Sequence, residues 1–363
     1  MSNLSTFSSK GLKFFFQSSR AKIDGKAVSQ LVKFIQGAKH SLDVAIYDMR
    51  NEDVLNALKG MSTKVRLQIL YDAGKAGGNS TTVDPKVSTT SQAIKAAGLT
   101  AFAQPVKEKG AHLMHDKFIV RDGASVWSGS GNFTNGGLLL QDNHFFTMDS
   151  PAVAAAYSKT FGDLGSPGHS ASHTIRVTGS PTKVVTGSPT KVKIGNIPVS
   201  ILFSTQRGET EGIETEVQNR LKGAKKIRLI AMLVSDPGIL ASLLALKKKD
   251  IMGVLDPHEM KVVMKNKTSD PKFWFATGDP RFVAANSHAF NGKGDKNDFM
   301  HNKVIIIDDK VVITGSYNFS ENAEANDENL LIFESAALAG AYNQYFNALF
   351  AQYQKTGAKL PPA

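Results

Sequence analysis

Apolar positions along the chain follow the same pattern twice. Near the start of each half, apolar residues three, four and seven or eight apart predict one face of an amphipathic helix. These positions are Ala27, Leu31, Phe34 and Ile35 in the first half, and Ile213, Val217 and Leu221 in the second. Ala27 and Ile213 are 213 − 27 = 186 residues apart. The pattern therefore predicts one folding unit that occurs twice in a single chain.

Each predicted helix runs into apolar segments that are short enough to be strands. Matching segments occupy residues 42–47 and 227–234, and then 117–120 and 303–307. A further apolar run at 65–71 has only a poor counterpart near Val254. Helices are expected to close the halves at 152–161 and 336–350. Alternating helix and strand signals predict an α/β protein in which each half is a mixed β-sheet flanked by helices.

The predicted domains are residues 1–165 and 197–363, with a linker at 166–196. Within the linker the octapeptide VTGSPTKV occurs twice in tandem, at 177–192. Its Gly-Ser-Pro units favour turns, so it is interpreted either as a tolerated local duplication or as an interaction arm or hairpin. The segment 270–300 shows no regular period, and a loop of that length is often functional or mobile.

The composition is that of a basic globular protein. Lys and Arg number 43 against 32 Asp and Glu, which gives a net charge of +11 and favours an anionic partner such as nucleic acid or acidic lipid. The chain has no cysteine, which excludes disulfides and cysteine nucleophiles. The most apolar later stretch, 239–246, is too short to span a bilayer. We expect a cytoplasmic protein.

The chemistry-bearing motif is also present twice. The pattern H-x-K-x-x-x-x-D occurs with His115, Lys117 and Asp122, and again with His301, Lys303 and Asp308. Each copy is followed by Gly-Ser-x-Asn, which supplies Ser130 and Asn132 in the first half and Ser316 and Asn318 in the second. The offset between the copies is again 301 − 115 = 186. Two copies of one half-site suggest a composite active site with two histidines.

The residue types suit phosphoryl transfer. Residues two apart on a strand face the same side, so each histidine lies beside a lysine, an arrangement that an anion such as phosphate stabilises. The serine and asparagine of the Gly-Ser-x-Asn loop add donors for phosphate oxygens. One histidine can attack phosphorus while the other protonates the leaving oxygen. No metal or cofactor is expected. Glu328 is the candidate acid for orienting the second histidine, and its offset counterpart, Asp142 (328 − 186), for orienting the first.

Together these motifs resemble the phospholipase D superfamily in its two-motif, single-chain form. The resemblance implies two sheet-and-helix halves related by a pseudo-twofold axis, an active site between them, a phosphohistidine intermediate and independence of metals. It implies that the site comprises His115, Lys117, Asn132, Ser130, His301, Lys303, Asn318, Ser316 and Glu328. Asp142 departs from the usual Glu, and Asp122 and Asp308 are interpreted as turn-stabilising. By analogy with the family, His115 is the nucleophile and His301 the general acid.

The substrate remains open at this level. A metal-independent nuclease is favoured by the charge and by the lysine clusters at 222–226 and 247–249, with Tyr317 and Trp274 as base-stacking or packing residues. The first alternative is a phospholipase D or phosphatidyltransferase, with residues 239–246 either docking on a bilayer or forming a core helix. The second is a non-catalytic module that binds phosphate esters. A monomer holds both half-sites, and a dimer is also compatible.

Overall fold

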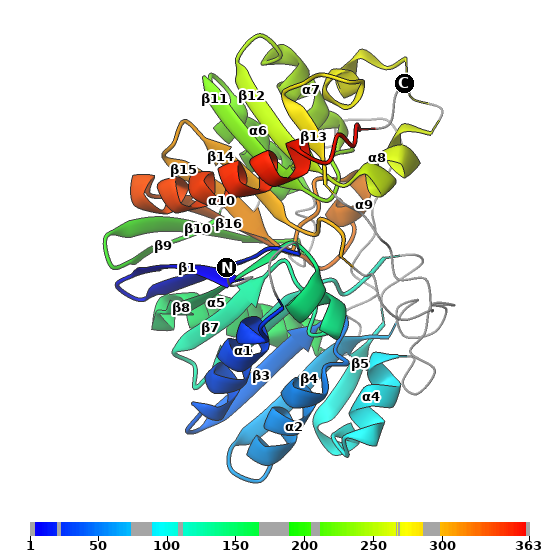
Figure 1. The fold of residues 1–363 in the computed structure, drawn as a ribbon. Helices are drawn as coiled ribbons and strands as arrows, with labels where there is room; N and C mark the ends of the chain where they lie inside the picture. The colour runs from blue at the N-terminus through cyan, green and yellow to red at the C-terminus, as the bar shows by residue number, and fades with distance from the viewer. Residues whose placement is uncertain are drawn as a thin grey trace.

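The computed structural model contains two eight-stranded mixed β-sheets, one in each half of the chain (Figure 1). It describes residues 4–19, 23–73, 89–107, 112–166, 189–204, 211–265, 267, 269–285 and 298–360. This architecture confirms the predicted α/β fold with two tandem halves. The tandem octapeptide at 177–192 falls largely outside the described residues, although its last three residues enter a strand of the second sheet, Thr190–Ile194.

The first sheet has the strand order β1-β2-β8-β7-β6-β3-β4-β5. Strands β3, β4 and β5 run parallel to one another, and the remaining neighbours pair antiparallel. The parallel pairs require crossover connections, which the intervening helices supply. The strands are β1 (Leu4–Ser9), β2 (Leu12–Gln17), β3 (Ser41–Ile46), β4 (Arg66–Asp72), β5 (Ala103–Val106), β6 (Lys117–Arg121), β7 (Ser125–Gly129) and β8 (Asn143–Asp149).

The second sheet repeats this order as β9-β10-β16-β15-β14-β11-β12-β13. Here too the strands β11, β12 and β13 are parallel and the others antiparallel. The strands are β9 (Thr190–Ile194), β10 (Ile197–Phe203), β11 (Lys226–Ala231), β12 (Asp250–Leu255), β13 (Phe282–Ala284), β14 (Lys303–Ile307), β15 (Val311–Gly315) and β16 (Asn329–Glu334). Strand β13 and the 3₁₀ helix η4 (Pro271–Ala276) give regular structure to part of the segment 270–300.

Helices cover both sheets. In the first half they are α1 (Lys26–Gln36), α2 (Glu52–Met61), α4 (Thr90–Ala96), the short turns η1 (Thr100–Phe102) and η2 (Gly136–Leu140), and α5 (Pro151–Leu164). In the second they are α6 (Glu211–Leu221), α7 (Pro237–Ala245), α8 (Pro257–Met264), α9 (Glu321–Glu324) and α10 (Ala336–Gln354). None of the described helices combines the length and apolar character that a bilayer crossing requires.

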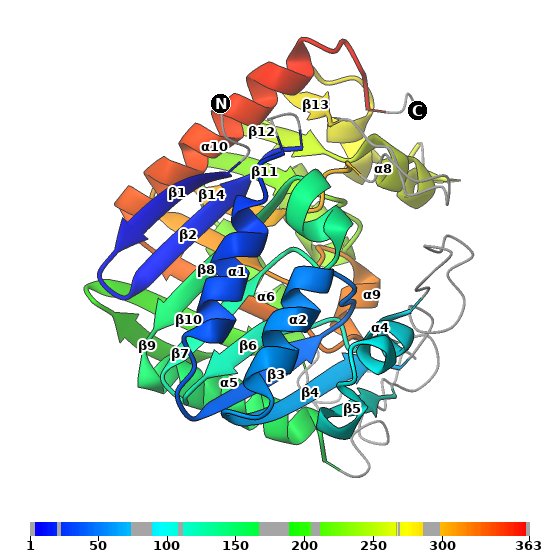
Figure 2. The same cartoon turned by 60° about the horizontal axis from the view of Figure 1, so that its bottom comes forward.

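The two halves share one hydrophobic core, which lies between the sheets. Helices α5 and α10 contribute to it, and aromatic rings from both halves meet there. Phe14 of β2 lies 5.2 Å from Phe333 of β16 and 5.8 Å from Tyr342 of α10. Helices α1 and α2 pack on the outer face of the first sheet, and α6 and α7 on the outer face of the second (Figure 2). The halves are therefore held in a fixed relative position by buried aromatic contacts.

Reciprocal backbone bonds show the twofold relationship between the halves. The amide of His115 donates to the carbonyl of Asp327 at 2.9 Å, and the amide of His301 donates to that of Asp142 at 3.0 Å. The segment before β6 thus pairs with the segment before β16, and the segment before β14 pairs with the segment before β8. The exchange places both histidines at the junction of the halves.

Three expectations about surface residues are settled by burial. Ile239, Leu240 and Leu243 of α7 lie in the core, so residues 239–246 form a core helix and not a bilayer-docking surface. Tyr317 and Trp274 are also buried, at 1% and 6% exposure, and serve as packing residues.

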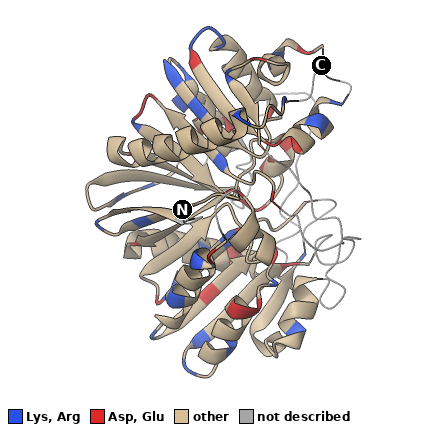
Figure 3. Cartoon of the chain, in the orientation of Figure 1, with Lys and Arg blue, Asp and Glu red and all other residues tan. Residues whose placement is uncertain are grey.

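The lysine clusters at 222–226 and 247–249 do not line the histidine site. In β11, Ala231 pairs with Lys303 whereas Ile227 pairs with Ile307, so the clusters lie at the end of the sheet remote from the histidines. Basic residues are spread over both halves (Figure 3). The lysine clusters therefore do not support nucleic-acid binding at the site itself.

Candidate active site

The two histidine–lysine pairs lie at the beginnings of equivalent strands. Lys117 is the first residue of β6 and Lys303 the first of β14, and each histidine precedes its lysine by two residues. The Lys117 ammonium donates to the carbonyl of His115 at 2.6 Å, and that of Lys303 to the carbonyl of His301 at 2.8 Å. All four residues are buried. Each lysine is consequently fixed beside its own histidine.

The electrostatics indicate that the four groups form one site. Burial lowers the pKa of His115 far below its usual value, and the charges of Lys117 and Lys303 lower it further. Burial and the same two lysines, Lys303 first, lower the pKa of His301. Each imidazole therefore responds to the lysine of the other half as well as to its own. Two lysines beside two imidazoles favour a bound anion and disfavour a divalent cation, and the negative charge of a bound phosphate in turn favours protonation of one imidazole.

A carboxylate from the second half orients the histidine of the first. The Nδ1 atom of His115 lies 2.8 Å from Oε1 of Glu328, which is buried at the junction of the halves. Glu328 also accepts a hydrogen bond from Asn326 at 3.4 Å. The sequence-based prediction that Glu328 orients His301 is wrong, because the halves exchange these segments. With Nδ1–H donated to Glu328, the Nε2 atom of His115 is the free nucleophilic position.

The second histidine has a neutral partner instead. Nδ1 of His301 lies 3.1 Å from Oδ1 of Asn143, and Ser130 donates to the same oxygen at 2.8 Å. Asn143 thus occupies in the first half the position that Glu328 occupies in the second. The prediction that Asp142 orients a histidine is therefore wrong, since the adjacent residue does so. The two half-sites are equivalent in position but differ in charge.

A one-residue insertion explains the error. From Ser130 to Asn143 is 13 residues, whereas from Ser316 to Glu328 is 12. The extra residue is accommodated in η2, which forms a π-type turn where the second half has the α-helical turn α9. A π-turn is the usual way to insert one residue into a helix. The offset of 186 that relates the two motifs therefore holds as far as Phe133 and Phe319, and beyond η2 the offset is 185.

Asp142 itself serves the junction between the halves. Its carboxylate accepts hydrogen bonds from the backbone amide of Ser19, at 2.7 Å, and from the hydroxyl of Tyr353 in α10. Burial raises its pKa to about 7. Asp142 therefore ties the N-terminal segment of one half to the last helix of the other.

The Gly-Ser-x-Asn loops follow β7 and β15. Gly129 and Gly315 have φ angles of 154° and 152°, and a Cβ atom there would lie 2.3 Å and 2.2 Å from a carbonyl oxygen of the neighbouring strand. Only glycine fits this close approach. Of the serines that follow, Ser130 donates to Asn143, and Ser316 accepts from the amide of Asn329, the residue after Glu328. The asparagines of the same loops, Asn132 and Asn318, are half-buried.

The aspartates of the two motifs follow the ends of β6 and β14, whereas the histidines precede the starts of these strands. Asp122 has a φ of 56° and its carboxylate accepts hydrogen bonds from the amides of Lys39, His40 and Ser41. Asp308, with a φ of 50°, accepts from the amides of Lys225 and Lys226. Both side chains bind the turn after a motif strand to the start of the neighbouring strand in the sheet, β3 or β11, which is a structural role.

Two aromatic residues that the sequence did not single out contact the histidines. The ring of Tyr47 lies 4.8 Å from the imidazole of His115 with an edge-on orientation, and the Lys117 ammonium lies 5.1 Å from the same ring. Phe299 lies 5.4 Å from the imidazole of His301. Tyr47 immediately follows strand β3, and only its position at the end of an apolar strand gives a sequence signal.

Comparison with known proteins gives a consistent family. A family model described as "Cardiolipin synthase, PLD-like domain" matches residues 31–164 and 217–350. Phosphatidylserine synthase of Haemophilus influenzae Rd KW20 superposes with a TM-score of 0.66 at 13% identity, covering 96% of this chain and 88% of that one, which shows the shared fold.

Curated relatives match over shorter segments. Phospholipase D of Rickettsia bellii is 58% identical over 45 residues, which are 12% of this chain and 22% of that protein. Mitochondrial cardiolipin hydrolase of Xenopus laevis is 26% identical over 136 residues, 37% of this chain and 59% of that protein. The matched segments thus span less than two thirds of these relatives.

Proposed function

Because the chain belongs to the family of phospholipase D-like (PLD-like) domains, we propose that it is a phosphodiesterase that forms a covalent phosphohistidine on His115. His115 is assigned as the nucleophile and His301 as the general acid because His115 Nδ1 lies 2.8 Å from Glu328 Oε1. A carboxylate on Nδ1 stabilises the positive charge that the imidazole acquires as Nε2 bonds to phosphorus. The amide oxygen of Asn143 gives His301 less of this stabilisation.

The proposed reaction has two steps. In the first, Nε2 of His115 bonds to phosphorus while the bond from phosphorus to the leaving oxygen breaks, and His301 gives that oxygen a proton. In the second, water attacks the phosphohistidine while His301 takes its proton, and His115 is released. Lys117 and Lys303 stabilise the charge on the phosphoryl oxygens in both steps. His301, whose partner is a neutral amide, releases a proton more readily than an imidazolium paired with a carboxylate.

We propose nucleic acid as the substrate class. The net charge of +11 favours a polyanion, and the described surface offers little for insertion into a bilayer. Among the described residues only Ile23 and Val262 are large exposed hydrophobics. The aromatic rings of Tyr47 and Phe299, which flank the two histidines, provide contacts for a base or sugar next to the reacting phosphate.

A phospholipid head group is the second candidate. It is favoured by the names of the relatives, a phospholipase D and a cardiolipin hydrolase, and by the lipid enzyme that gives the family model its description. The same chemistry serves both substrates, because each presents a phosphodiester with an alcohol as the leaving group.

One assay separates these proposals. Labelled single- and double-stranded DNA and RNA, and vesicles of phosphatidylcholine with cardiolipin, are incubated in EDTA with the protein and with His115→Ala and His301→Ala. His40→Ala, a histidine exposed on the surface, is the matched control. We expect cleavage of nucleic acid that survives EDTA, falls as salt rises and is lost only in the two site variants. Turnover of vesicles alone would assign the lipid substrate, and no turnover of either would refute the catalytic proposal.

A further inference from the structure

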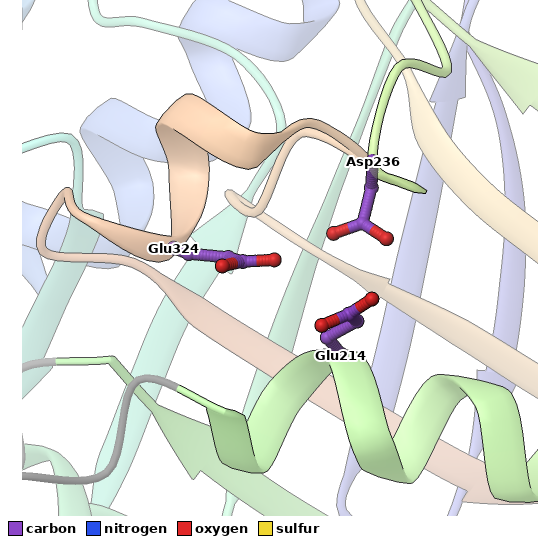
Figure 4. A group of neighbouring side chains, drawn as sticks. All are labelled: Glu214, Asp236 and Glu324. Carbon is purple, nitrogen blue, oxygen red and sulfur yellow. The ribbon is translucent and has the colours of Figure 1, made fainter. Parts of the chain in front are cut away.

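Three carboxylates converge in the second half, outside the histidine site. Glu214 of α6, Asp236 at the start of α7 and Glu324 of α9 each place a carboxylate oxygen within 4.8 Å of the others. Figure 4 shows the three side chains pointing toward one another from three separate elements. Acidic clusters alone are common on protein surfaces, so the surroundings of these carboxylates decide what this cluster does.

Asp236 is fully buried, and one of its two carboxylate oxygens accepts no hydrogen bond from the described residues. Its Oδ1 atom caps helix α7 by accepting from the amides of Gly238 and Ile239 at 3.0 and 2.8 Å. Its Oδ2 atom is buried and has no hydrogen-bond partner among the described residues. Figure 4 shows this carboxylate directed at the carboxylates of Glu214 and Glu324. A buried carboxylate oxygen that faces two further carboxylates is strongly destabilised unless a cation or a proton lies between them.

The equivalent positions of the first half hold no carboxylates, so the fold itself does not require this cluster. Asp236 and Asn51 are equivalent, because each caps a helix and each donates its amide to the carbonyl of Phe319 or Phe133. The counterparts of Glu214 and Glu324 are Val28 (214 − 186) and Leu138 (324 − 186), which are buried in the first half's core. Asn51 completes that arrangement by donating to Asn135 at 2.8 Å.

The second half also makes room for one of the carboxylates. A Cβ atom on Gly238 would lie 1.8 Å from Glu214 Oε1. The equivalent residue of the first half is Asp53 (238 − 185), which has a side chain. The glycine thus admits the carboxylate to the cluster.

Among the described residues, no basic side chain neutralises the cluster. Within the described part of the chain, none of the three carboxylates forms an ion pair with Lys or Arg. Burial, and then the neighbouring Asp236, raise the pKa of Glu214 to about 7 and that of Glu324 to about 9. Tyr317 adds a buried hydroxyl with no hydrogen-bond partner among the described residues, whose pKa is raised by burial and by the charges of Asp236, Glu324 and Glu214.

We propose that Glu214, Asp236 and Glu324 bind a divalent cation of the Ca²⁺ class. Hard cations take carboxylate oxygens, and Ca²⁺ at about 2.3–2.6 Å from each ligand bridges oxygens up to about 5 Å apart, whereas Mg²⁺ at about 2.0–2.1 Å requires a tighter set. The three oxygens lie within 4.8 Å of one another, which is inside the span that one Ca²⁺ ion bridges. The ion joins α6, the start of α7 and α9.

The role of this ion is structural. The residues before Asp236 pair with Phe319, which directly follows Asn318 of the Gly-Ser-x-Asn loop. The cation therefore stabilises the segment that pairs with the end of the Gly-Ser-x-Asn loop. It takes no part in the reaction at the histidines. The cluster and the catalytic chemistry are independent, so each proposal stands or falls by its own experiment.

The test measures thermal unfolding of the full chain in EDTA and in CaCl₂, with NaCl of equal ionic strength as the salt control. The double variant Asp236→Asn with Glu324→Leu installs the residues of the first half and keeps a helix cap. We expect CaCl₂ to raise the unfolding temperature of the wild type by several degrees and to leave that of the double variant unchanged. In EDTA the double variant should be at least as stable as the wild type, because it lacks two buried like charges.

Two controls complete the experiment. Asp163→Asn removes an exposed carboxylate elsewhere, and this variant should keep the full response to CaCl₂. Calorimetric titration with CaCl₂ should show one site per wild-type chain and none in the double variant. The proposal is overturned if CaCl₂ has no more effect than NaCl on the wild type, which would mean that the carboxyls share protons, or if the double variant responds like the wild type.

Discussion

Glu328 of the second half holds His115 of the first through a 2.8 Å contact to Nδ1, whereas His301 is held by the amide oxygen of Asn143. One repeat unit has thus produced two half-sites of unequal charge. Under the proposed mechanism, the histidine with the carboxylate partner, His115, is the nucleophile. Glu328 and Asn143 can be replaced without changing the histidines, so their contributions can be tested separately.

Replacing Glu328 with Gln should impair the nucleophilic step. The amide keeps the size of the side chain but removes the charge that stabilises the positive imidazole, so we expect kcat to fall by about 10²- to 10⁴-fold. Asn143→Asp is the matched change at the other half-site and should be far less damaging. Steady-state kinetics with the same phosphodiester would measure both, and equal losses would contradict the proposed asymmetry.

Replacing His301 with Ala should be damaging only when the leaving group needs a proton. With a nucleic-acid phosphodiester we expect a loss of about 10²- to 10⁴-fold, the usual contribution of a general acid. With bis(p-nitrophenyl) phosphate, whose leaving group departs as a stable anion, the formation of the covalent intermediate should be much less affected. A comparison of burst rates checks this. His115→Ala should abolish the burst with either substrate, and a burst that persists would reverse the assignment.

The lysine clusters should contribute little to turnover. Lys222, Lys225 and Lys248 are exposed at the end of the second sheet remote from His301, about 13 Å or more along the strands. That exceeds the screening length of about 8 Å at physiological salt. The triple alanine variant should therefore keep kcat/KM within about threefold for a short oligonucleotide at that salt. A drop of about tenfold or more would show that these lysines contact the substrate.

Asp142 should make the protein less stable as pH rises. Its folded-state pKa is raised by burial to about 7 from a usual value near 3.8, so the folded state favours the protonated carboxyl. The contribution is fully present below pH 4 and is lost as pH rises toward 7. Asp142→Asn should reduce the decline in the urea midpoint between pH 4.5 and 7.5. An unchanged decline would mean that other groups cause it.

Much of the fold follows directly from the sequence because it depends on local patterns. The periodic apolar positions of α1 and α6 and the two H-x-K strands identify the repeat, and the structure confirms two equivalent halves. The assignment of the histidine partners failed for two physical reasons. The π-type turn η2 shifts the register by one residue after Ser130, and the halves exchange the segments that carry Asn143 and Glu328.

Contacts between distant segments carry no local signal either. Tyr47 and Phe299 reach the histidines only because the two sheets place them there. The carboxylates Glu214, Asp236 and Glu324 are far apart in the chain and come together only through packing of α6, α7 and α9. The comparison of one half with the other, Val28 and Leu138 against Glu214 and Glu324, becomes informative once the structure aligns the repeats.

The most direct test of the account is to trap the covalent intermediate. The protein would be mixed with a phosphodiester labelled at phosphorus, quenched under alkaline denaturing conditions that preserve phosphohistidine, digested and analysed by mass spectrometry. The account predicts the phosphoryl group on the peptide that contains His115, and its absence in His115→Ala. Label on the peptide that contains His301, in the wild type and in His115→Ala alike, would contradict it.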